Sequence, residues 1–130
     1  MQRLLKNGPM NKSLVKVAVK KAEESKHAFR VGAVLFSGSN IIAAACNDSA
    51  YVGFMRKLMA FPSRHAEVEV VRNIPRETLK GSEVLVVRIT KKGLLAYSKP
   101  CKPCTKLLTS CGIRRVHYVA KDGSLAKMTL

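Results

Sequence analysis

Val84-Leu85-Val86-Val87-Arg88-Ile89 is a run of aliphatic residues interrupted by a single arginine. Strands that are covered on both faces have such nearly continuous apolar runs, whereas strands with one face in water alternate apolar and polar residues. The run therefore predicts a strand inside a sheet that is covered on both faces. This is the arrangement expected of an α/β protein.

The segments around this strand predict the other elements of one α/β domain over residues 1–130. Apolar residues recur at helical spacing after a capping Asn or Ser, and short β-rich runs alternate with Gly-containing turns. We expect helices over residues 13–25, 63–72 and 102–110. We expect strands over residues 31–36, 41–46, 84–89, 116–119 and 124–130. The first two strands should form a hairpin, and the last two should be antiparallel because too few residues remain for a parallel crossover.

The balance of charge is strongly positive. The chain has 24 Lys and Arg residues against 8 Asp and Glu residues, a formal net charge of +16. Such a charge predicts attraction to polyanions or phosphate-bearing ligands, although it is also compatible with a solvated basic surface. No apolar run approaches the ~18 residues of a membrane span, and no signal peptide is evident, so we expect a cytoplasmic protein without a membrane partner.

Two short motifs carry candidate metal ligands. His65-Ala66-Glu67 offers an imidazole and a carboxylate, and Pro100-Cys101-Lys102-Pro103-Cys104 offers two thiols. Cys101 and Cys104 are three residues apart, so one edge of a helix can present both sulfurs. His65 and Glu67 are two residues apart, so they can serve one site only at the start of a helix, for which Ser63 is a candidate cap.

These residue types in this pattern predict a catalytic zinc site. His65, Cys101 and Cys104 are three ligands, and catalytic zinc sites keep the fourth position for water. Zinc lowers the pKa of that water from about 15.7 to about 7. Glu67 is then the candidate proton carrier. The remaining cysteines and histidines, together with Glu69, are assigned no chemistry: we expect Cys46 and Cys111 to be core thiols, His27 and His117 to be structural or exposed, and Glu69 to be solvated.

From about residue 22 to residue 119, the chain resembles the cytidine and deoxycytidylate deaminase superfamily. The H-x-E and P-C-x-x-C motifs carry the resemblance, and Val31-Gly32-Ala33-Val34 resembles the first strand of the family. The resemblance implies a three-layer α-β-α sandwich with a five-stranded mixed sheet. It also implies that Asn47, Ala66 and Ser98 contact the substrate.

The expected function is zinc-dependent hydrolysis of cytosine to uracil in a nucleoside or nucleotide, of the cytidine, deoxycytidine, CMP or dCMP type. Arg30, Arg56, Lys57 and Arg64 are candidate phosphate-binding residues. Homo-oligomerisation is also expected, because many members of the family assemble. An antiparallel last strand is typical of family members that act on free nucleosides, whereas histidine as the first ligand is more typical of those that act on nucleotides and nucleic acids.

Two alternatives remain open. The first is a deaminase acting on cytosine or adenine in single-stranded DNA or RNA, with Tyr51, Phe54 and Phe61 stacking on bases. The second is a zinc-binding protein without catalytic activity, although no residue of the motif is missing.

Overall fold

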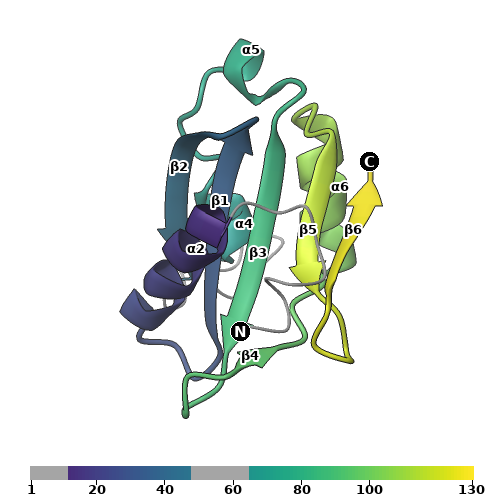
Figure 1. Ribbon diagram of the computed structural model, residues 1–130. Coiled ribbons are helices and arrows are strands. Elements are labelled where there is room, and N and C mark those ends of the chain that lie inside the picture. Colours follow the sequence, from purple (N-terminus) through teal and green to yellow (C-terminus); the bar gives the residue numbers. More distant parts are fainter. Residues whose placement is uncertain (1–11, 48–64) are drawn as a thin grey trace.

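A mixed sheet lies between two layers of helices in the computed structural model, which describes residues 12–47 and 65–130 (Figure 1). The helices are α2 (Lys12–Glu24), α4 (Ala66–Glu69), α5 (Arg76–Leu79) and α6 (Lys102–Ser110). The strands are β1 (Arg30–Ser37), β2 (Asn40–Cys46), β3 (Glu83–Ile89), β4 (Leu95–Ala96), β5 (Arg115–Val119) and β6 (Leu125–Thr129). The predicted three-layer sandwich is confirmed.

The sheet has the order β2-β1-β3-β5-β6. β1 is antiparallel to both β2 and β3, so the predicted hairpin is confirmed. β3 and β5 are parallel and are connected through α6, and β6 returns antiparallel to β5 as expected. The five predicted strands form this path, and a sixth, β4, pairs with the end of β3. β4 has only two residues, too few to produce a recognisable alternation.

Each face of β3 packs against a different layer, as its apolar sequence predicted. Leu85, Val87 and Ile89 belong to the core under α2. Val84 and Val86 belong to the core on the opposite face, together with residues of α4 and α6. This alternation follows from the two-residue period of a strand. It therefore also determines which β3 side chains can reach the side of the sheet where α4 and α6 begin.

The helices differ from the prediction in two places. The helix expected over residues 63–72 is only the four-residue α4, followed by turns to Asn73, whose φ is 62°. Residues 63 and 64 lie outside the described part of the chain. The expected exit loop contains the short helix α5, which starts directly after Pro75 because proline fixes a φ suited to helix initiation. No helix in the described ranges is long and apolar enough to cross a bilayer.

Candidate active site and metal centre

The starts of α4 and α6 bring the three predicted metal ligands together. His65 is the N-cap of α4 and has an extended backbone, and Cys101 is the N-cap of α6. Cys104 follows in the first turn of α6, where Pro103 is tolerated because that turn needs no backbone N–H donor. The expectation that the H-x-E motif stands at a helix start is thus confirmed for His65 and Glu67.

The ligand atoms of His65, Cys101 and Cys104 all lie within 4.8 Å of one another. The Nδ1 atom of His65 is 3.2 Å from the Sγ atom of Cys104 and 3.8 Å from that of Cys101. Tetrahedral zinc bonds of about 2.0 Å to nitrogen and 2.3 Å to sulfur imply N···S separations of about 3.6 Å. Both observed separations are close to this value, so the cluster fits a zinc ion.

The pKa values of Cys104 and His65 are both shifted by their surroundings. Burial raises the pKa of the Cys104 thiol far above its usual value, and the neighbouring Glu67 carboxyl and Cys101 thiol raise it further. Without a metal, negative charge is therefore unfavourable there. Burial and the nearby His27 lower the pKa of His65. His65 is thus held neutral, the form in which an imidazole binds a metal.

Glu67 lies on α4, two residues after His65, and is only 6% exposed. Burial raises the pKa of its carboxyl, while hydrogen bonds from its own backbone N–H and from the Cys104 thiol act in the opposite direction. A carboxyl whose pKa is raised toward neutrality can both accept and donate a proton, which is the property a general acid–base needs.

A cavity of about 270 Å³ opens in front of these groups. Its lining contains the predicted proton carrier, two of the predicted ligands and all three predicted substrate contacts: Glu67, His65, Cys101, Asn47, Ala66 and Ser98. Cys104, the third ligand, is fully buried behind the cavity wall. The structure therefore brings the predicted metal ligands, the predicted proton carrier and the three predicted substrate contacts to one place.

Asn47 follows β2 and uses most of its amide to hold the backbone. Its Oδ1 accepts hydrogen bonds from Ser25 Oγ at 2.6 Å and from the Val31 backbone N–H at 2.9 Å. Its Nδ2 donates to the Phe29 carbonyl at 2.6 Å. A primary amide has two N–H donors, so one of them is left for the cavity.

Ser98 has a hydroxyl that forms hydrogen bonds to two strands of the sheet. Its Oγ donates to the Val86 carbonyl at 2.8 Å and accepts from the Val119 backbone N–H at 2.8 Å. Ser98 thereby connects β3 to β5 and positions the segment that leads into Cys101. The hydroxyl has no proton left to donate to a ligand, because its O–H already binds the Val86 carbonyl.

Several residues of the cavity wall were not predicted from the sequence. They are His27, Phe29, Arg88, Tyr97 and Lys99. His27, expected to be structural or exposed, thus joins the candidate site. For Arg88 a signal was available, because an arginine within an aliphatic strand needs a polar environment. For Phe29 and Tyr97 no local signal existed, since both lie outside periodic segments.

Glu69 and Arg30 have contacts that differ from those expected from the sequence. The prediction that Glu69 is solvated is wrong: its side chain is 13% exposed and pairs with Arg72 at 3.5 Å. Arg30, expected to help bind phosphate, donates instead to the Thr90 carbonyl at 2.6 Å and does not line the cavity. The candidates Arg56, Lys57 and Arg64, and the aromatic residues Tyr51, Phe54 and Phe61, lie outside the described residues.

The remaining cysteines and histidine do not line the cavity. Cys46 and Cys111 are half-buried and form no disulfide. Cys111 packs against the core under α4 and α6. His117 is buried and bonded to Glu83, a structural role.

The fold and the cluster together define an α/β protein with a zinc-type His-Cys-Cys centre beside a buried carboxyl. Residues 10–120 match the model of the cytidine and deoxycytidylate deaminase zinc-binding region, so the chain belongs to this family. Membership indicates cytidine or deoxycytidylate deaminase activity in general terms, and it agrees with zinc as the cofactor of the cluster.

Solved structures with the same fold include the cytidine deaminase of Burkholderia pseudomallei, with a TM-score of 0.66 and 17% identity over 92% of this chain and 93% of that one. The dCMP deaminase of cyanophage S-TIM5 has a TM-score of 0.48 and 20% identity over 82% of each chain in its apo form. Its complex with dCMP and dUMP gives the same score and identity, over 82% of this chain and 81% of that one. No curated protein matches the sequence significantly.

Proposed function

We propose that this chain is a zinc-dependent deaminase that converts cytosine to uracil in a nucleoside or nucleotide. The observation that supports this best is the position of Glu67, which is buried and lines the same cavity as the candidate metal ligands His65 and Cys101. A site for a metal-activated water and a proton carrier are thus adjacent.

The reaction adds water to cytosine and releases ammonia. His65, Cys101 and Cys104 would hold zinc, which would lower the pKa of a water molecule to about 7. Glu67 takes a proton from the attacking water and delivers it to the ring nitrogen. Glu67 then takes the remaining proton of the added hydroxyl group and passes it to the amine as the C–N bond breaks, so the products are the uracil form and ammonia. The buried position of Glu67 suits this exchange, because its raised pKa favours return of the proton.

Three further residues are proposed to position the substrate. The free N–H of Asn47 Nδ2 donates to the sugar. The backbone N–H of Ala66, in the first turn of α4 where donors lack intrahelical acceptors, contacts the base. The backbone of Ser98 contacts the exocyclic amine of the base, because the Ser98 hydroxyl is already engaged.

Single-stranded nucleic acid is the second candidate substrate. Two aromatic side chains on the cavity wall are unusually exposed, Phe29 at 57% and Tyr97 at 40%. Each has a cation near its ring: Arg88 Cζ is 4.5 Å from the Phe29 centroid, and Lys121 Nζ is 5.5 Å from that of Tyr97. Exposed aromatic rings beside cations are how proteins bind unpaired bases.

The decisive experiment is a substrate panel combined with the variant Glu67→Gln. Cytidine, deoxycytidine, CMP, dCMP, cytosine-containing oligonucleotides and adenosine-containing RNA are incubated with the zinc-loaded protein, and products are identified by their mass increase. We expect Glu67→Gln to keep its zinc and its melting temperature but to lose at least about 100-fold in kcat, because a general acid–base contributes about that much or more.

The matched control is Glu77→Gln on the exposed surface of α5, which should keep full activity. If zinc is bound in stoichiometric amount and no substrate is turned over, the chain is a zinc-binding protein without catalytic activity. Full activity of Glu67→Gln would exclude Glu67 as the proton carrier.

A further inference from the structure

Arg88 lies on the face of β3 that carries the candidate active site. Val84 and Val86 precede it at two-residue intervals and pack into the core under α4 and α6. The register partner of Arg88 on β1 is Val31, which also packs against that core. Arg88 therefore lies on the same face of β3 as Val84 and Val86, beyond the core, and lines the cavity.

The guanidinium group of Arg88 is held in place but is not neutralised. Its Cζ lies 4.5 Å from the centroid of the Phe29 ring, a cation–π contact that restricts its position. Its Nε is buried and has no hydrogen-bond partner. No carboxylate of the described residues forms an ion pair with Arg88. The Nε atom is shielded by the protein, but Arg88 lines the cavity, so its positive charge is available to an anionic ligand there.

The charges around the cavity favour an anionic acceptor. Lys99 contributes a second cation to the wall, and Glu67 is the only carboxylate among its described residues. Glu67 belongs to the buried end of the site beside the metal ligands. The planar fork of an arginine matches the geometry of phosphate oxygens, to which it can donate two hydrogen bonds at once.

We propose that Arg88 binds a phosphate group of the substrate and thereby selects nucleotides over nucleosides, an inference that rests on the proposed deaminase function. The phosphate belongs either to a mononucleotide or to a phosphodiester of a single strand. The recognising chemistry is the same in both cases. Arg88 acts in substrate selection, and Glu67 remains the proton carrier.

The test compares the wild type with Arg88→Gln, Arg88→Lys and the control Arg76→Gln, which removes the same charge from exposed α5. The substrates are deoxycytidine, dCMP and a short oligodeoxynucleotide with one cytosine. The ratio of kcat/KM for a phosphate-bearing substrate to that for deoxycytidine should fall about 10- to 100-fold in Arg88→Gln, the usual effect of losing a hydrogen bond to a charged group. Arg88→Lys should restore part of it, and Arg76→Gln should leave it unchanged. The substrate whose ratio falls identifies the source of the phosphate.

Binding without turnover separates this inference from the deaminase proposal. In the Glu67→Gln background, calorimetry measures the affinity for dUMP and deoxyuridine with and without Arg88→Gln. A selective loss of dUMP affinity supports the phosphate site even if no substrate is turned over, in which case the deaminase proposal alone fails. An equal loss for nucleoside and nucleotide, or no loss for either dUMP or the oligonucleotide, overturns the role of Arg88.

Discussion

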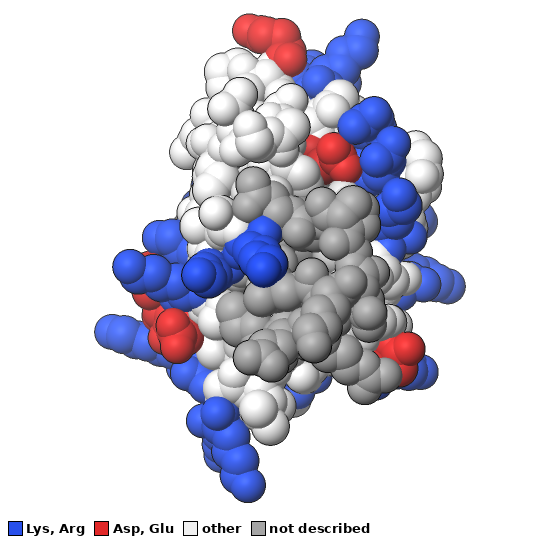
Figure 2. Space-filling model, viewed as in Figure 1, with Lys and Arg blue, Asp and Glu red and all other residues white. Residues whose placement is uncertain are grey.

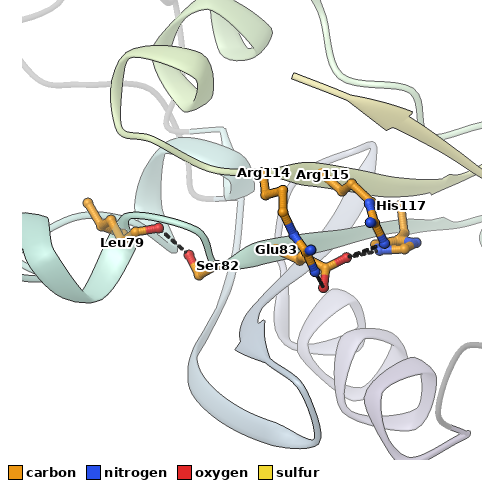
Figure 3. Close-up of polar contacts among 6 residues, drawn as sticks. All are labelled: Leu79, Ser82, Glu83, Arg114, Arg115 and His117. Atoms are coloured by element: carbon orange, nitrogen blue, oxygen red, sulfur yellow. Dashed lines mark hydrogen bonds and ion pairs between the residues drawn. The ribbon is translucent and has the colours of Figure 1, made fainter.

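Glu83 is the centre of a polar cluster that stabilises the sheet away from the active site (Figure 3). His117 Nε2 donates to Glu83 Oε1 at 2.8 Å, and Arg114 donates to Oε2 at 3.1 Å. Arg115 adds an ion pair at 3.8 Å. Burial alone would raise the pKa of Glu83, but the hydrogen bonds and charges of His117 and Arg114 outweigh burial and lower it. The cluster thus connects the start of β3 to β5.

Replacing this carboxylate should destabilise the fold in a pH-dependent way. Because the folded pKa of Glu83 is below the unfolded value of 4.5, its ionised form contributes stability above about pH 4.5, and that stability is lost as the pH falls through the folded pKa. At pH 7, Glu83→Gln should lower the free energy of unfolding by about 1–3 kcal/mol. Urea unfolding at pH 7 and pH 3 measures this, with exposed Glu23→Gln as control. A loss of the same size at both pH values would contradict the role given to the carboxylate.

At the residue scale, chemistry that depends on close spacing could be predicted. His65 and Glu67, or Cys101 and Cys104, are near neighbours in the chain, so the chemistry they can share is visible in the sequence. The burial of Glu69 could not be predicted, because its 13% exposure depends on how four-residue α4 packs rather than on neighbouring residues.

Helix α2 approaches strand β1 closely at Gly32. A Cβ atom at Gly32 would lie 2.1 Å from the carbonyl oxygen of Ala18 and 2.7 Å from the backbone nitrogen of Ala22. Ala18 and Ala22 are fully buried. Three small residues therefore let a helix backbone lie directly on a strand, and the position of α2 over the sheet depends on them.

The variant Gly32→Ala should consequently lose about 3 kcal/mol of stability or more, since a whole helix must move to accept one methyl group. Gly123→Ala is the control: its Cβ meets nothing within 4 Å, and only its φ of 87° is unfavourable. That control should lose about 1 kcal/mol. Thermal and urea unfolding measure both. Equal losses would mean that the close approach of α2 is not what requires glycine.

Lys and Arg residues occur along the whole length of the sequence. Figure 2 shows Lys and Arg side chains along both sides of the face in view, with few acidic side chains between them. With a net charge of +16, long-range attraction to polyanions is expected whatever the active site binds. Self-association of copies, which like charges oppose at low salt, remains a prediction for sedimentation analysis.

Binding to a single-stranded oligonucleotide should therefore weaken steeply with salt. If the protein neutralises about five phosphates of a strand, a log–log plot of affinity against salt concentration should have a slope of about −3.5. Fluorescence anisotropy at salt concentrations from about 50 to about 200 mM measures this slope. A peptide nucleic acid of the same base sequence, which has no phosphates, is the control. A flat salt profile would count against a polyanionic partner.

The metal ligands, the proton carrier and the covered sheet followed from local sequence, because ligation needs particular residue types a few positions apart and burial imposes a strict two-residue period. The residues that surround the site could not be predicted from local sequence. Phe29, just before β1, contacts Arg88 of β3 almost sixty positions away, and the amide of Asn47 and the hydroxyl of Ser98 are hydrogen-bonded to backbone groups distant in the sequence. Such contacts arise from strand order and register, which long-range packing selects and which no short stretch of residues encodes.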